Sequence, residues 1–287
     1  MRMFLFLILI LNLIMAKGQA NNGVIHYVSA EGENDFRNEY FVKLLTLALE
    51  KTTSKNNFIS LKPVASMQQG RALHQLAQGK NVDIVWTVTS IEREEQLLPI
   101  RVPLLKGLLG HRVLIIRADD EEKFSQVNSL TDLLHYTAGQ GHDWPDTQIL
   151  QANKVEVTTA STYNGLFGML LAGRFDFFPR GINEAWQEVD LQENPRLIVE
   201  KSLLLYYPSP IYFFVNNNSK AMANRIEKGL QLAIADGSFD QLFYSHSAHQ
   251  KMFALSQLKQ RQVINLQNPL LPMLTPLSNE KLWYQIK

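Results

Sequence analysis

The chain has 287 residues, and its 28 basic side chains are balanced by 27 acidic ones. This balance leaves no field strong enough to favour nucleic acid or an anionic membrane as a partner. The sequence contains no cysteine, which excludes disulfides, thiolate metal sites, cysteine nucleophiles and lipid attachment at a cysteine. A hydrophobic core must therefore hold the fold together, and 46% apolar residues can supply it.

The first residues have the layout of a secretory signal peptide. Arg2 is followed by the apolar run 3–11, and small residues follow up to Ala20. The run is shorter than the roughly 20 residues that a membrane-spanning helix needs. We expect cleavage after Ala20; the alternative is an uncleaved N-terminal anchor, because polar residues interrupt the cleavage site. With no lipidated cysteine behind the signal, the mature chain is expected in the periplasm.

The first half of the mature chain alternates between strand and helix patterns. Strands are expected over 23–29, 59–64 and 82–86, and helices after the capping residues Asp35 and Ser66, the second closed by Gly79. This order predicts a mostly parallel sheet with helices on its faces.

After a further strand over 111–117, the same order begins again. Helices are expected over 130–134, from Pro145 and after the capping residue Ser161, and strands over 136–139, 155–159 and 175–178. The helix end, glycine and strand of 76–85 resemble those of 171–178, which indicates two similar lobes. The alternative is coincidence, because many parallel α/β units end a helix with glycine.

The C-terminal part completes the pattern. A strand is expected over 209–215, a helix after Ser219 and another helical turn over 239–244. Residues 253–287 are expected to form a short polar helix and then a proline-interrupted tail that wraps over the body of the protein.

The order of these elements resembles the bacterial extracellular solute-binding proteins of family 3, which include the amino-acid-binding components of ABC transporters. The motifs that carry this resemblance most specifically are residues 83–85 with 89–94, residues 170–176 and residues 235–239. The resemblance covers nearly the whole mature chain to about residue 250, although each motif is short. It implies an α/β, two-lobed, periplasmic-binding-protein-like (type 2) fold, in which two mainly parallel sheets flanked by helices are joined by two crossing hinge strands.

The organisation expected on this basis has three parts. Residues 1–20 are the signal peptide, 21–112 plus 214–287 form lobe 1 with the wrapping tail, and 113–213 form lobe 2.

Open parallel sheets bind ligands beyond the carboxyl ends of their strands, and an arginine stands at this place in each lobe. Arg93 matches the position where members of family 3 commonly hold a ligand carboxylate, and a guanidinium group suits this task because it donates two parallel hydrogen bonds. The alternative is a surface arginine paired with Glu92, Glu94 or Glu95.

Arg180 departs from the family pattern, because amino-acid-binding relatives typically have an acidic residue near this strand end. A second cation facing Arg93 favours an anionic ligand. The alternatives are that Arg180 pairs with Glu184, and that Asp143 or Asp146 supplies the acid.

The other candidate ligand-binding residues carry hydroxyl groups or aromatic rings. They are Thr87, Thr89, Ser90, Trp86 and Trp144. Tryptophans in α/β lobes are more often core residues, which is the alternative for both of these. For Arg101 and Arg112 we expect structural ion pairs.

Motifs of catalysis are missing from the sequence: it has no phosphate-binding loop and no glycine-flanked serine. His246 and His249 are three residues apart, but no carboxylate or third ligand accompanies them at metal-ligand spacing. We therefore expect a protein that is not an enzyme, with no cofactor and no metal. The expected function is capture of a small carboxylate-bearing solute by a monomer that delivers it to an ABC-type importer. The alternatives are a periplasmic sensor that presents its closed state to a membrane receptor, and an orphan member with a degenerate site.

Overall fold

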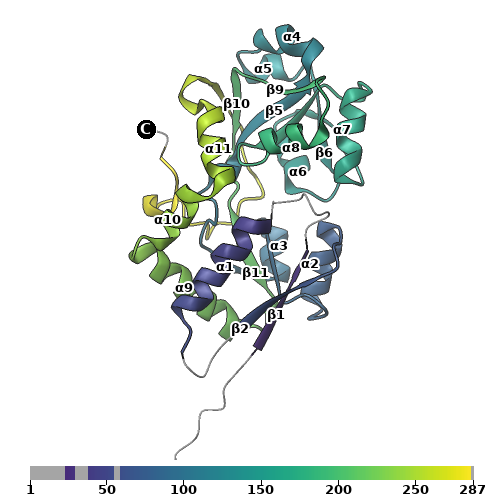
Figure 1. Ribbon diagram of the computed structural model, residues 1–287. Coiled ribbons are helices and arrows are strands. Elements are labelled where there is room, and N and C mark those ends of the chain that lie inside the picture. The colour runs from purple at the N-terminus through teal and green to yellow at the C-terminus, as the bar shows by residue number, and fades with distance from the viewer. Residues whose placement is uncertain (1–22, 30–37, 55–58, 286–287) are drawn as a thin grey trace, which may run out of the picture.

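A computed structural model describes residues 23–29, 38–54 and 59–285. The expected signal peptide and the expected helix cap Asp35 lie outside the described residues. Within the described ranges the chain forms two α/β lobes, one above the other in Figure 1, and each lobe has its own sheet. No helix in these ranges is long and apolar enough to cross a membrane.

The first lobe is built on a five-stranded sheet in the order β2-β1-β3-β11-β4. Its strands are β1 (Gly23–Val28), β2 (Ile59–Val64), β3 (Ile84–Val88), β4 (Leu98–Ile100) and β11 (Ile211–Val215). Its helices are α1 (Glu39–Lys51), α2 (Gln69–Ala77), α3 (Ile91–Gln96), α9 (Lys220–Ala235) and α10 (Ser238–Ser245). β1 runs parallel to β2 and β3, and β11 runs antiparallel to β3 and β4.

The second lobe contains a seven-stranded sheet in the order β12-β10-β5-β8-β6-β7, with β9 also paired to β5. Its strands are β5 (His111–Arg117), β6 (Thr137–Gly141), β7 (Glu156–Ala160), β8 (Phe177–Gly181), β9 (Leu197–Val199), β10 (Leu203–Tyr206) and β12 (Gln262–Asn265). Its helices are α4 (Glu121–Ser125), α5 (Leu130–Leu133), α6 (Pro145–Ala152), α7 (Tyr163–Leu171), α8 (Ala185–Gln192) and α11 (Ser247–Ser256). Short 3₁₀ turns cover Leu108–Gly110, Ala118–Asp120, Leu258–Gln260 and Glu280–Leu282.

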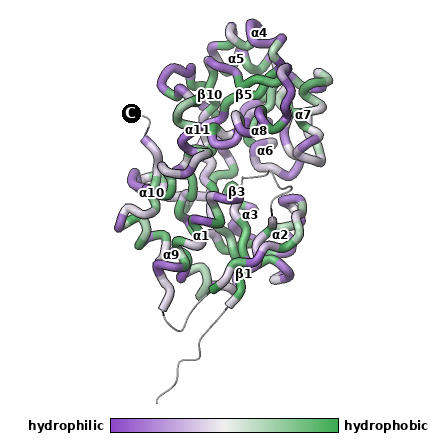
Figure 2. The backbone as a smooth tube through the Cα atoms, viewed as in Figure 1, coloured by the Kyte–Doolittle hydropathy of each residue, from purple (hydrophilic) through white to green (hydrophobic). Residues whose placement is uncertain are grey.

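Buried apolar side chains fill the space between sheets and helices in both lobes. The strands β5 and β11 are almost entirely buried, as expected for central strands covered on both faces. In Figure 2 the hydrophobic colour accordingly follows the interior strands, and hydrophilic segments lie toward the outside.

Strand pairing corrects the expected lobe boundaries. Residues 111–112 already pair in the second sheet, and residues 211–213 belong to the first sheet. The tail does not stay on lobe 1, because β12 pairs in parallel with β10 and extends the second sheet. This pairing satisfies backbone groups along β10 that would otherwise form an open sheet edge. The chain then returns to the first lobe, where the N–H of Ile91 donates to the carbonyl oxygen of Leu270 at 2.9 Å.

One helix-to-strand connection is repeated in the two lobes, as the sequence indicates. α2 is closed by Gly79 and α7 by Gly173, at φ +63° and +67°. Each glycine N–H donates to a carbonyl three residues back at 3.0 Å, and the next N–H donates to a carbonyl five residues back at 2.9 Å. Glycine is favoured here because side chains disfavour the left-handed region. The start of each helix differs from expectation. α2 begins after Gln68 and not Ser66, and α7 is capped by Thr162 and not Ser161.

Close packing of α1 on α9 generates a stability prediction. A Cβ added at Gly229 would lie 1.9 Å from the carbonyl oxygen of Ala48, which is a backbone atom that cannot move away alone. We expect Gly229→Ala to destabilise the protein by about 1–3 kcal/mol, because the two helices must separate. The matched control is Gly168→Ala in α7, where a Cβ meets no atom within 4 Å, and it should be stabilising by up to about 1 kcal/mol. Urea unfolding of both variants measures the difference, and equal stabilities would contradict the packing.

Candidate functional site

A cavity of about 240 Å³ lies between the two lobes. Residues 84–88 of β3 line it from the first lobe, and residues 144–146, Tyr163, Arg180 and Glu184 line it from the second. The cavity therefore lies beyond the carboxyl ends of strands in both sheets, where open α/β sheets bind ligands. Its size is close to the lower end of the range for small-molecule sites, about 300–1,000 Å³.

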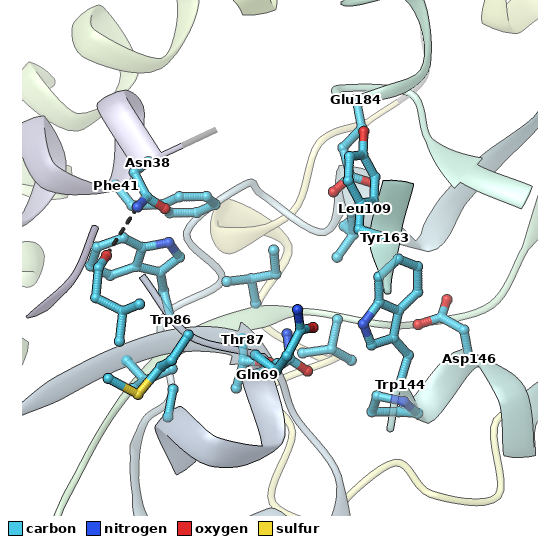
Figure 3. A pocket seen from close by; sticks show the side chains of 18 of the residues that line it. Asn38, Phe41, Gln69, Trp86, Thr87, Leu109, Trp144, Asp146, Tyr163 and Glu184 are labelled. Atoms are coloured by element: carbon cyan, nitrogen blue, oxygen red, sulfur yellow. Dashed lines mark hydrogen bonds between the residues drawn. The ribbon is translucent and has the colours of Figure 1, made fainter. Parts of the chain in front are cut away.

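Aromatic side chains form two walls of the cavity. Phe41 and Trp86 stack in the first lobe, with ring centroids 5.7 Å apart and planes at 23°. Figure 3 shows these two rings on one side of the pocket, and Trp144 and Tyr163 on the other side. Trp144 is held in place by stacking on Phe178. The cavity is thus flanked by flat apolar surfaces.

Arg112 lies at the start of β5 and lines the cavity although it is only 2% exposed. Its Nη2 atom is 2.7 Å from Oδ1 of Asp146, and its Nη1 atom is 3.7 Å from Oε2 of Glu184. Burial is the largest single effect and disfavours the charged form, but Asp146, Tyr207 and Glu184 together outweigh it and leave the pKa of Arg112 above its ordinary value. The Nη2 atom is therefore in a close ion pair, and the buried Nε donor has no hydrogen-bond acceptor among the described residues. Arg112 is thus a buried, paired cation at the cavity wall.

Arg180 lies within β8 and is also buried. Its Nε and Nη2 atoms donate to the two oxygens of Glu188 at 2.7 and 2.6 Å, and Nη2 is 3.1 Å from Oε2 of Glu184. Burial opposes the charge, but the carboxylates of Glu184 and Glu188 hold the pKa of Arg180 well above its usual range. The guanidinium also lies 4.9 Å from the ring centroid of Trp144. Arg180 thus pairs with Glu184, one of the alternatives from sequence, and more strongly with Glu188.

Charge in the cavity wall is balanced. Among the described lining residues, Arg112 and Arg180 are the cations, and Asp146 and Glu184 are the carboxylates. Glu188 lies behind them and supplies the two-oxygen contact to Arg180, so Glu184 is left with the weaker contacts. Burial is the main cause that raises the pKa of Glu184. This carboxylate would be stabilised by an additional positive group.

Arg93 lies in α3, just behind the cavity, and is not among the residues that line it. Its Nη1 atom donates to Oγ1 of Thr87 and to the carbonyl of Val88, both at 2.7 Å. Its Nη2 atom donates to Oε1 of Gln69 at 2.6 Å and to the carbonyl of Asp143 at 3.3 Å. Burial lowers the pKa of Arg93 to about 10. The guanidinium is therefore occupied by neutral oxygen atoms of the protein, and it does not pair with Glu92, Glu94 or Glu95.

Asp143 belongs to the second lobe but contacts the first. Its Oδ2 atom accepts a hydrogen bond from the N–H of Gly70, in the first turn of α2, at 2.9 Å. Asp143 thus contacts the first lobe through both its carboxylate and its carbonyl oxygen.

The other residues expected at the site fall into two groups, those that line the cavity and those that do not. Trp86, Thr87, Trp144 and Arg180 line the cavity. Ser90 caps α3 by accepting the N–H of Arg93 at 3.2 Å, and Thr89 donates to Oε1 of Glu94 at 2.7 Å. Thr89, Ser90 and Asp143 do not line the cavity.

The ion pairs expected for Arg101 and Arg112 are present, with Glu94 and Asp146 as the partners. Sequence reasoning missed that Arg112 and Glu184 also line the cavity, because the strand pattern does not show which residue faces it. Only the pairing of Arg112 with Gly181 across β5 and β8 brings it to the ligand edge of the sheet. Glu184 was considered only as a partner of Arg180, and its position next to the strand end is the signal that could have identified it.

Comparisons with solved structures show the same fold. The chain is similar to an ancestral arginine-binding protein bound to arginine, with 18% identity and a TM-score of 0.57, over 78% of this chain and 97% of that one. An arginine-specific periplasmic binding protein of Salmonella typhimurium has 14% identity and a TM-score of 0.56, over 77% and 96%. A histidine kinase sensor domain with similarity to periplasmic binding proteins has 14% identity and a TM-score of 0.59, over 78% and 94%.

These neighbours define the class of fold. The protein has the two-lobed α/β fold of periplasmic binding proteins, which confirms the fold predicted from the sequence. The neighbours are mostly amino-acid-binding proteins, as expected for the family 3 resemblance, and one is named as an amino-acid-binding precursor of cyclohexadienyl dehydratase. No protein-family model matches the chain, and no curated protein matches it in sequence.

The paired state of Arg180 leads to a prediction. We expect Arg180→Ala to destabilise the protein by about 3–5 kcal/mol, because it leaves the buried Glu188 without a partner. The matched control is Lys201→Ala, which removes an ion pair to Glu121 from a lysine side chain that is 77% exposed and should change stability by less than about 1 kcal/mol. Chemical denaturation measures the free energy of unfolding of both variants. Equal losses of stability would show that Arg180 is not held by its carboxylates.

Proposed function

We propose that the protein is a periplasmic solute-binding protein that captures a small carboxylate-bearing solute, of the amino-acid class, in the cavity between its lobes. The observation that supports this most strongly is Arg112. It is a buried cation in the cavity wall that is paired with Asp146 through Nη2, and its Nε donor has no hydrogen-bond acceptor among the described residues. A ligand carboxylate is the natural acceptor for such a donor, because charge-assisted hydrogen bonds to a guanidinium are strong and directional.

The balance of charge favours a zwitterion over a simple anion. Arg180 is neutralised by Glu188, so it does not provide the extra positive charge that the sequence indicated. Glu184, whose pKa burial raises, is the group that an ammonium would stabilise. We assign the ligand carboxylate to Arg112 and the ligand ammonium to Glu184, and the ligand body to the space between the aromatic walls.

The neighbours support delivery to an ABC-type importer as the role of this binding, since one of them is an amino acid ABC transporter substrate-binding protein from Streptococcus pneumoniae, at 14% identity. We propose no catalysis, no bound cofactor and a monomer in the periplasm, exported by a signal peptide that is cleaved after Ala20.

A second candidate function is sensing, which the histidine kinase sensor domain among the neighbours favours. In that case the closed state would be recognised by a membrane receptor. The adjacent genes separate the two roles, because permease and ATPase genes indicate transport, whereas a lone gene or a neighbouring signalling gene indicates sensing.

Binding is tested by a thermal-shift screen of the mature chain against amino acids, dicarboxylates and neutral sugars, followed by calorimetry. We expect one or more amino acids to stabilise the protein. Arg112→Lys keeps the charge beside Asp146 but removes the guanidinium donors, so the affinity should fall roughly tenfold to a hundredfold. Arg101→Lys is the matched control, because Arg101 pairs with Glu94 and does not line the cavity. Stabilisation by sugars alone, or unchanged affinity in Arg112→Lys, would refute the assignment.

A further inference from the structure

A direct contact of protein groups joins the two lobes beside the cavity. The turn between β6 and α6 places Asp143 of the second lobe against the start of α2 in the first lobe, where Oδ2 accepts the N–H of Gly70 at 2.9 Å. This carboxylate therefore caps the N-terminus of α2, although it comes from the other lobe.

Among the described residues of the first lobe, no side chain caps the start of α2. Gln68, the residue before the helix, makes no side-chain capping bond, and the first turn contains no acidic residue. The first N–H groups of a helix have no partner within it, and they carry the positive end of the helix dipole. A carboxylate brought from the other lobe supplies both an acceptor and a negative charge.

The turn that carries Asp143 is fixed on both sides. The N–H of His142 donates to the carbonyl of Ala160 at 3.2 Å, and the N–H of Trp144 donates to the carbonyl of Gly141 at 3.1 Å. Trp144 also stacks on Phe178 in β8. The position of Asp143 is therefore set by contacts within the second lobe.

Arg93 strengthens the same contact from the first lobe. Its Nη2 atom donates to the carbonyl of Asp143 at 3.3 Å and to Gln69 at 2.6 Å. Gln69 is the first residue of α2, so Arg93 connects the start of this helix with the turn of the other lobe.

From these contacts we infer that Asp143 is an interlobe clasp, which together with Arg93 and the start of α2 favours the closed cleft before any solute binds. The inference rests on the proposed function only in taking this cleft as the ligand site. A binding protein that is partly closed before the ligand arrives has a larger fraction of binding-competent molecules. Its apparent affinity rises in proportion to that fraction. Arg93 then acts in closure and does not itself contact the ligand.

The lobe separation of the ligand-free protein tests the clasp. Because the chain has no cysteine, Glu50→Cys on α1 and Asn164→Cys on α7 can carry spin labels at two exposed positions without background. The protein is unfolded, dialysed and refolded first, so that no solute from the cell holds it closed. Pulsed electron spin resonance then gives the distance distribution between the lobes.

We expect one main, short distance in the unsubstituted background. Asp143→Ala should raise the ratio of open to closed molecules roughly threefold to tenfold, which is the effect of losing a capping carboxylate. Asp143→Asn keeps an acceptor oxygen but no charge, so its ratio of open to closed molecules should lie between those of the background and of Asp143→Ala.

Asp132→Ala is the matched control, because Asp132 accepts the N–H of Asn128 at 3.1 Å wholly inside the second lobe. It should leave the distance distribution unchanged. Circular dichroism confirms that each variant is folded. A distribution that is the same in Asp143→Ala and the background would overturn the clasp, and so would a wide-open background. Since no ligand is used, either result is separate from a failure of the proposed binding function.

Discussion

Two buried arginines, each paired with carboxylates, organise the side of the second lobe that faces the cavity. A charge taken out of water is tolerated only when it is paired and hydrogen-bonded. Arg112 and Arg180 lie on neighbouring antiparallel strands, so one group of carboxylates serves both. These carboxylates come from the first turn of α6 and from the segment that enters α8. The ion pairs thereby fix both helices to the sheet at the place where the cavity opens.

The two lobes make different contributions as a result. The second lobe provides the charged groups of the cavity, and the first provides the stacked rings of Phe41 and Trp86. A ligand with a charged head and an uncharged body matches this division, with its head toward the second lobe. The arginine that the sequence placed in contact with the ligand, Arg93, is held by neutral oxygens at the junction of the lobes.

Local patterns were sufficient to predict the fold but not the site. The strands around β1, β2 and β5, the helix start at Pro145 and the repeated glycines follow from hydrophobic spacing and backbone preferences, which act within a few residues. β12 was missed because its partner, β10, is about 60 residues away in the chain. The stronger partner of Arg180 was missed for a similar reason. Glu188 lies in α8, the helix that follows Arg180, and the sequence does not show that this helix turns Glu188 back toward the strand.

A crystal structure of the mature chain with a bound amino acid would test the proposed site most directly. We expect the ligand carboxylate on the guanidinium of Arg112 and the ligand body between the aromatic walls, with Arg93 still bound to Thr87 and Gln69. A ligand carboxylate held by Arg93, with Arg112 contacting only Asp146 and Glu184, would contradict the proposed site.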